Sequence, residues 1–176
     1  STLVVGFTGL AACLSYLAVT GWYLSAADVA LLALDILLLA AFGTALSSCV
    51  NFFLTTDGQA SAVGTVVSAG YGFVCGAYMP ISSFGPGLQR AFSFLPGTYG
   101  TGLLRNHALR GVFAQMRALG FPDAVMDAIG DSVDCNLYFY GARVHTGAMY
   151  AVLCGSILLL MAAYLLMNHL AARKNG

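Results

Sequence analysis

The sequence predicts an all-α membrane protein with four transmembrane helices, and three observations lead to that prediction. Hydrophobic residues make up 59% of the 176 residues and charged residues only 8%, whereas about a quarter of the residues of a soluble domain are charged. Four apolar segments reach the ~20 residues that a helix needs to cross a bilayer. Barrel strands would show a period-2 alternation, which is absent, so the four segments are expected to be helices.

The four predicted spans are residues 2–20, 27–53, 60–81 and 146–170. Ser25 and Asp28 have the spacing of a capping box, which predicts that the second helix begins at Ser25. Short polar links join the first three spans, whereas residues 82–145 form a long connection before the fourth. We expect residues 1–176 to form a single transmembrane domain, with residues 82–145 as a structured extracytoplasmic connection within it.

The segment 76–105 is apolar but is interrupted by three of the four prolines of the chain. Pro80 and Pro86 remove backbone hydrogen bonds, so a helix cannot run straight through them. Broken backbone at membrane depth is tolerated only against other protein or beside a water-filled cavity, which predicts a re-entrant helical hairpin. The predicted hairpin consists of a short helix near residues 88–95, a turn at Pro96 and Gly97, and a second short helix from about Tyr99.

Two more helices are predicted within the long connection. Apolar residues between Leu109 and Leu119 lie on one side of a helical wheel and Arg110 and Arg117 on the other, as in an amphipathic helix at the membrane interface. Residues 121–133 predict the next helix, with Pro122 at its first position. The five cysteines follow no pattern of a disulfide framework or a metal site.

Charge and motifs argue against several classes of function. Seven Lys and Arg balance seven Asp and Glu, so no basic field is present to hold nucleic acid. Glu is absent, the three His are far apart, and neither H-E-x-x-H nor a phosphate-binding G-x-x-x-x-G-K-[ST] loop occurs. We therefore predict no catalytic residue, no metal and no cofactor bound by this chain, and an intramembrane enzyme is only the third hypothesis.

Orientation follows from the basic residues after the last span. Arg173 and Lys174 favour a cytoplasmic C-terminus in a multi-pass protein of the plasma membrane. This orientation places the five arginines of the long connection outside. A plain count of basic residues would instead place that connection in the cytoplasm. We give that count less weight because the rule loses force in loops longer than about 60 residues.

The interrupted segment also carries a resemblance to a known family. An apolar span ending in G-x-x-x-P, then L-P-x-T-Y and then L-R, resembles the C-terminal part of the membrane domain of ATP-binding-cassette (ABC) exporters, in the type-two permease family. The matching residues are Gly76, Pro80, Leu95, Pro96, Thr98, Tyr99, Leu104 and Arg105. The resemblance covers most of the chain, because the order of spans, the long outer connection and the final span all fit.

The resemblance implies a six-span bacterial permease that dimerises in the lipid membrane and works with a separate ABC ATPase subunit. ATP and Mg²⁺ would then bind to that ATPase and not to this chain. The chain would supply spans three to six, without the first two spans and the cytoplasmic segment that couples to the ATPase. The expected function is export of a substrate by alternating access; the alternative is a non-transporting membrane scaffold or assembly protein.

The candidate substrate path or gate consists of Asp35, Tyr71, Phe73, Tyr78, Pro80, Pro96, Gly97, Tyr99 and Arg105. Asp35 either lines the path or is a structural carboxyl bonded to Ser, Thr or Tyr of a neighbouring helix, since no basic residue lies in a predicted span. Arg105 either anchors a headgroup or polar substrate, or caps the end of a short helix. The GxxxG pair Gly72 and Gly76 either packs within the chain or contributes to a dimer.

Overall fold

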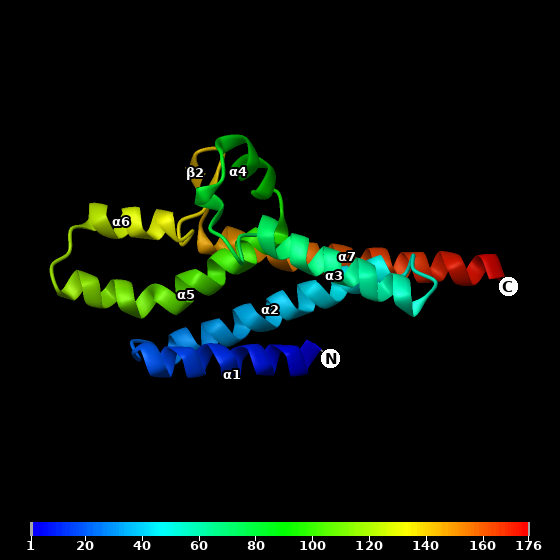
Figure 1. Cartoon of the computed structure of the whole chain (residues 1–176), viewed down its shortest axis with the longest axis horizontal. Helices are drawn as coiled ribbons and strands as arrows, with labels where there is room; N and C mark the ends of the chain where they lie inside the picture. Colours follow the sequence, from blue (N-terminus) through cyan, green and yellow to red (C-terminus); the bar gives the residue numbers. More distant parts are fainter. Residues whose placement is uncertain (1, 176) are drawn as a thin grey trace.

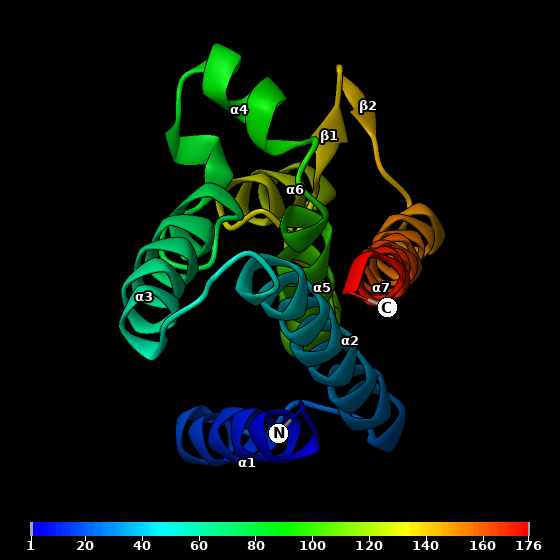
Figure 2. The ribbon, with the colours of Figure 1, turned by 90° about the vertical axis from the view of Figure 1, so that its right-hand side faces the viewer.

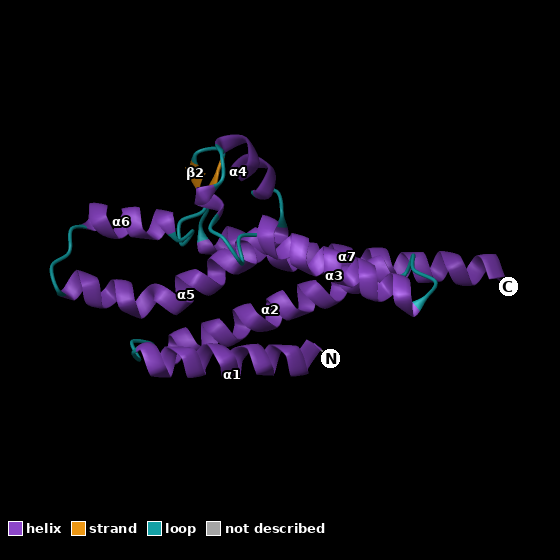
Figure 3. Ribbon diagram, in the orientation of Figure 1, coloured by secondary structure: helices purple, strands orange, loops and turns teal. Residues whose placement is uncertain are grey.

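The computed structural model describes residues 2–175, which are mostly helical (Figures 1 and 3). The helices are α1 (Thr2–Thr20), α2 (Ala26–Asn51), α3 (Asp57–Val74), α4 (Pro86–Phe92), α5 (Pro96–Ala118), α6 (Asp123–Ser132) and α7 (Thr146–Asn175), with a 3₁₀ turn η1 at Ile81–Ser83. Two short strands, β1 (Tyr138–Phe139) and β2 (Ala142–Arg143), pair antiparallel in front of α7 in the sequence.

The centre of the fold is α2, which packs against α1, α5 and α7, while α5 also packs against α7. Figure 2 looks along the bundle and shows α1 below this group and α3 to one side. Aliphatic and aromatic side chains from α2, α5, α7 and the segment after α6 form the core. These residues are Phe42, Tyr99, Leu103, Leu137, Met149, Leu153 and Ile157. By contrast, α3 contributes no buried residue.

Two helices within residues 2–175 are long and apolar enough to span a membrane, α2 over its whole length and α7 over Thr146–Arg173. In each, only 17% of the most apolar stretch is buried within the protein. Leucines of α7 such as Leu158 and Leu159 remain 66% and 68% exposed. A surface this apolar calls for lipid or a partner to cover it, which fits a membrane location better than the core of a soluble protein.

The start of α2 confirms the predicted capping box. Ser25 is the N-cap, its hydroxyl accepts the backbone N–H of Asp28, and the Asp28 carboxylate accepts the backbone N–H of Ser25 at 3.0 Å. These reciprocal bonds satisfy two amide groups that the first turn leaves without helical partners. The helix therefore begins where the sequence predicts, and α7 likewise begins at Thr146.

The third predicted helix ends earlier than expected, at Val74 instead of residue 81. Gly76 adopts a left-handed conformation (φ +80°), which terminates a helix and which residues with a side chain rarely adopt. The chain then leaves the helix axis and forms what we call the lobe, residues 75–95, which contains η1 and α4 (Figure 1). Pro80 precedes η1 and Pro86 is the first residue of α4.

The predicted turn at Pro96 and Gly97 is instead the start of a helix. Pro96 occupies the first position of α5, where the missing N–H needs no helical partner. The expected short second helix and the expected amphipathic helix are one continuous helix of 23 residues. No proline lies between Gly97 and Leu119, so nothing in that stretch forces a break.

The helix predicted over residues 121–133 is present as α6, with Pro122 one position earlier than expected, at the N-cap. The hairpin that follows was not predicted. Its two-residue turn has positive φ at Tyr140 (50°) and Gly141 (87°), as in the tight turns that match the twist of paired strands. Tyrosine rarely adopts a positive φ, so the sequence around Tyr140 does not predict a tight hairpin turn.

Candidate functional site

A buried polar network joins the three central helices at Asp35. The Asp35 side chain is fully buried, and its Oδ2 lies 2.6 Å from Nδ1 of His107 on α5. Its Oδ1 accepts a hydrogen bond of 2.5 Å from the hydroxyl of Tyr150 on α7. The rings of His107 and Tyr150 stack with centroids 6.3 Å apart. One carboxylate thus links α2, α5 and α7 at a site closed to solvent.

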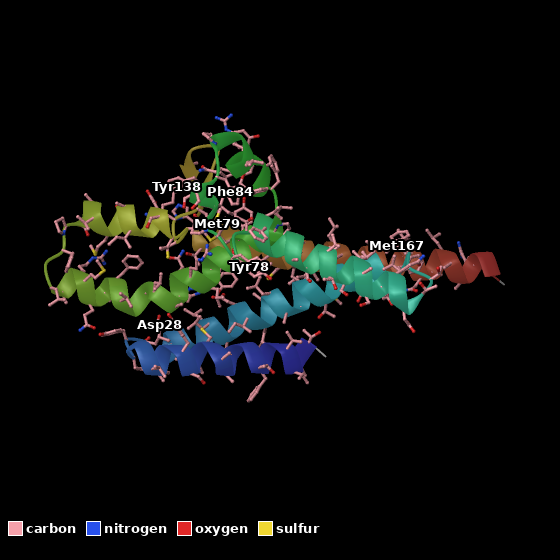
Figure 4. The ribbon with its side chains drawn as sticks, viewed as in Figure 1. Asp28, Tyr78, Met79, Phe84, Tyr138 and Met167 are labelled. Atoms are coloured by element: carbon pink, nitrogen blue, oxygen red, sulfur yellow. The ribbon has the colours of Figure 1, made fainter. Side chains whose placement is uncertain are left out.

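The spacing of charged residues along two helices explains this pairing. Asp28 and Asp35 are seven residues apart, two turns of α2, and therefore lie on the same face. Their partners Arg110 and His107 are three residues apart on one face of α5, which runs in the opposite direction (Figure 1). Asp28 pairs with Arg110 at 3.4 Å, and Figure 4 shows Asp28 beside α5.

The sequence left two alternatives for Asp35, a residue of the substrate path or a structural carboxyl bonded to a neighbouring helix. The hydrogen bond from Tyr150 of α7 is the kind of bond that the structural alternative expects. His107 was missed as a partner because it belongs to the long connection, which was not expected to enter the bundle. A histidine beside a carboxylate can also hold or pass a proton. His107 is 6% exposed, so the network lies in the interior of the bundle. The network therefore holds the three helices together.

A second polar cluster fixes the lobe through Asp134. This residue is 3% exposed and its backbone is left-handed (φ 54°). Its carboxylate accepts the backbone N–H groups of Ile81 and, at 3.0 Å, of Ser82, and it pairs with Arg105 at 3.2 Å. Arg105 also donates to the carbonyl oxygen of Gly76. The guanidinium and carboxylate together tie the lobe to α5 and to the end of α6.

The candidates around the start of α5 lie close together. The N–H of Gly97 donates to the Tyr71 hydroxyl at 3.1 Å, and the Tyr99 hydroxyl donates to the carbonyl of Ser93 at 2.5 Å. Gly97 has no room for a side chain, because a Cβ there would lie 2.5 Å from the Tyr71 ring. Tyr71 and Gly97 thus form a close contact between α3 and α5, Pro96 precedes it as the first residue of α5, and Tyr99 bonds to the end of α4.

The remaining candidates lie elsewhere. Phe73 and Tyr78 pack edge to face with ring centroids 5.3 Å apart, and they are 53% and 67% exposed. Figure 4 places Tyr78 where the lobe rises from the bundle. The Tyr78 ring covers Gly72, and Gly76 contacts Ile81, so the GxxxG pair packs within the chain. The structure does not bring this group together with Asp35.

Among residues 2–175, no group of three or more His, Cys, Asp or Glu side chains is placed to hold a metal ion. Comparisons of the chain with protein-family models, curated proteins and solved structures find no match. The function is therefore inferred from the geometry of the chain itself.

Cys135, next to Asp134, is expected to resist thiol reagents. Its burial raises the pKa of the thiol to about 11, an effect that nearby Arg105 only partly offsets. At pH 8 about one thiol in a thousand would be ionised, against about a quarter of free cysteines with a pKa near 8.5. The thiolate is the reactive form, so reactivity should rise with pH towards 11.

A charged maleimide applied to the folded protein at pH 8, followed by peptide mass spectrometry, measures this directly. We expect Cys135 to stay unmodified until the protein is denatured. Ser132→Cys supplies the control, because it places an exposed thiol three residues away and should be labelled in the folded protein. Equal labelling of both positions would show that Cys135 is not buried.

Proposed function

We propose that the chain is the membrane permease part of a bacterial ABC exporter, which moves a substrate outward by alternating access. ATP and Mg²⁺ would bind to a separate ATPase subunit. The observation that carries the proposal is the lobe: the interrupted segment stands out from the bundle, and Arg105 and Asp134 fix its base there. This arrangement agrees with the family resemblance, in which a broken segment separates the last two spans.

The proposal takes α1 and α3 as two further spans. Their 19 and 18 residues correspond to about 28 and 27 Å of helix, slightly less than the ~30 Å of a bilayer core. A mismatch of this size is accommodated by local thinning of the bilayer. Although Tyr71 packs against the core, α3 buries none of its residues fully, so much of its surface is available to lipid or to a second permease protomer.

In this proposal the lobe is a re-entrant gate at the outer end of the path. Leu88 and Phe94 are 51% and 62% exposed, which suits contact with the lipid headgroup zone. The network at Asp35 makes α5 move with α2 and α7, since it links all three helices. Movement of the spans, driven by the ATPase, would then reach the lobe through the contact of Gly97 with Tyr71.

Export by the full-length protein tests this proposal, with Gly97→Ala as the informative variant. The added methyl group collides with Tyr71 at the joint between α3 and α5, so we expect export and substrate-stimulated ATP hydrolysis to fall by about tenfold or more. Gly87→Ala is the matched control in α4, where no atom lies within 4 Å of the new Cβ. Both variants should insert into the membrane normally.

The purification itself provides the second readout. An ABC ATPase should copurify with the full-length protein, and candidate substrates should raise its ATP turnover. A purified protein with no ATPase, together with unchanged phenotype for Gly97→Ala, would contradict export. That outcome would favour the alternative of a non-transporting scaffold.

A further inference from the structure

A cleft of about 330 Å³ lies beside the first turns of α7. Its walls come from the segment between α4 and α5, from α5, from β1 and from the chain around the start of α7. The lining residues are Ser93, Phe94, Tyr99, Phe139, Val144 and Val152. Figure 2 shows β1 between α4 and the strand that leads into α7. The volume lies near the lower end of the range of about 300–1,000 Å³ that is typical of ligand sites, so the cleft can hold part of a molecule.

The cleft offers neither a charge nor an unpartnered polar side chain to a ligand. None of its described lining residues is charged. The Ser93 hydroxyl donates to the carbonyl of Arg90 at 2.8 Å, and the Tyr99 hydroxyl donates to the carbonyl of Ser93 at 2.5 Å. The other lining side chains are two phenylalanines and two valines. Water finds few partners in such a space, whereas apolar groups fill it favourably.

The side of α7 that lines the cleft continues away from it as what we call the apolar strip. Val152, Leu159 and Leu166 follow one another at intervals of seven residues, two helical turns, and are 40%, 68% and 59% exposed. Gly155 and Ala162 lie between them and are exposed as well. The strip is about 21 Å long at 1.5 Å per residue, and it lies within the part of α7 that can span a membrane. A ligand in the cleft can therefore extend along this strip.

An aromatic cluster lies beside the cleft. Phe94, Phe139 and Tyr140 pack edge to face, with ring centroids 5.0–6.2 Å apart. Phe94 and Tyr140 are 62% and 66% exposed. Tyrosine near the end of a span typically lies at the level of the lipid headgroups, because its ring is apolar and its hydroxyl is polar. Tyr140 precedes α7 by only a few residues, which places the cleft where the span would leave the lipid core.

We propose that this cleft holds the upper part of one acyl chain of a membrane phospholipid, with the rest of the chain lying along the apolar strip of α7. Val152 belongs to both the cleft and the strip, so a chain keeps continuous apolar contact from one to the other. The headgroup then lies near Tyr140, in water. The inference rests on the proposed membrane location of α7, but it requires neither the ATPase nor export.

Quenching of tryptophan fluorescence by brominated lipid tests the proposal. Trp22, in the link between α1 and α2, is the one tryptophan of the chain, so Trp22→Phe gives a background without tryptophan. In that background, Phe139→Trp places a reporter in the cleft, and Leu165→Trp places a second reporter on the exposed surface of α7 outside it. The full chain is reconstituted in vesicles of phosphatidylcholine, with or without bromine in the upper half of the acyl chains.

We expect brominated lipid to quench both reporters. Val152→Phe, added to Phe139→Trp, should reduce the quenching to about half or less, because the larger ring fills the space that the acyl chain would occupy. The same change should leave the quenching of Leu165→Trp unaltered. Leu158→Phe is the matched control, because it adds a ring to another exposed side of α7, and it should leave the quenching of Phe139→Trp unaltered.

Phe139 and Val152 are 37% and 40% exposed, so both substitutions should leave the unfolding temperature measured by circular dichroism unchanged. Equal quenching of Phe139→Trp with and without Val152→Phe would overturn the proposal, since lipid would then only touch the surface of the hairpin. Quenching of Leu165→Trp without quenching of Phe139→Trp would overturn it too, and would leave the cleft to an apolar segment of a partner protein. Neither of these two results would bear on export.

Absence of quenching at both positions has a wider meaning. It would contradict the membrane location of α7, and with it both this inference and the proposed export. The Leu165→Trp reporter thus distinguishes failure of the lipid site from failure of the proposed function.

Discussion

Replacing Asp35 with alanine is expected to destabilise the purified protein by about 2–6 kcal/mol, because it leaves two polar groups without their partner and each such loss costs about 1–3 kcal/mol. The substitution leaves His107 and the Tyr150 hydroxyl buried without the carboxylate that each one contacts. It also removes the one side chain that connects α2, α5 and α7 through hydrogen bonds to both neighbours. Thermal or denaturant unfolding in detergent, followed by circular dichroism, measures the loss.

Two further variants grade this effect. Asp35→Asn keeps the shape and can still accept a hydrogen bond from Tyr150, so its loss should be smaller. Asp123→Ala is the matched control, because the Asp123 side chain is 84% exposed and lies 3.7 Å from Arg117; it should cost no more than about 1 kcal/mol. Equal stability of Asp35→Ala and Asp123→Ala would show that the network contributes nothing.

Gly111→Ala is the second substitution for which we expect a large loss. A Cβ at Gly111 would lie 1.9 Å from the carbonyl oxygen of Tyr23 and 2.6 Å from its carbonyl carbon. These are backbone atoms, so no side-chain rotation can relieve the collision, and either α5 or the link between α1 and α2 must move. Overpacking of this kind usually costs about 1–3 kcal/mol, and the rigid neighbour places this site at the upper end.

Gly155→Ala is the control for Gly111→Ala. Gly155 is also helical, in α7, but no atom lies within 4 Å of a Cβ built there. The change should therefore be neutral or slightly stabilising, because alanine loses less backbone freedom than glycine in a helix. The same unfolding measurement compares the two variants. A stable Gly111→Ala protein would show that α5 does not approach Tyr23 as closely as the structure shows.

The predictions that depend on local chemistry agree best with the structure. Ser25 and Asp28 define the start of α2 through bonds that close within four residues, so sequence alone is sufficient to place it. Composition likewise identifies α2 and α7 as apolar helices long enough to span a membrane. These features require no knowledge of what the rest of the chain does.

The predictions that failed depend on contacts between distant residues. The sequence gives no direct sign that Arg105 holds Gly76. It also gives no direct sign that the glycines of α5 fit closely against α2, the α1–α2 link and the segment after α6. The partnership of Asp35 with His107 spans 72 positions and was missed for the same reason. The spacing of Asp28 and Asp35 on α2 does match that of Arg110 and His107 on α5. This match is recognisable only once the two helices are known to be neighbours.

The distance in sequence between Asp35 and Tyr150 has a consequence for biosynthesis. Tyr150 follows Asp35 by 115 positions, so at a translation rate of about 5–20 residues per second it is made roughly 6–23 s later. In the proposed membrane location, α2 would enter the bilayer during that time with a carboxyl group that lacks its phenolic partner, at a cost of about 2.5–3.5 kcal/mol.

The neighbours of Asp35 can offset that cost. The run LLALDILLLA contains six leucines and one isoleucine around the aspartate, and each contributes about −0.3 to −0.6 kcal/mol to insertion, or about −2 to −4 kcal/mol together. The leucines around Asp35 would thus offset the insertion cost of its carboxyl group before α5 and α7 are made. In the proposed membrane location, a newly made α2 would therefore stay inserted until α5 and α7 are made.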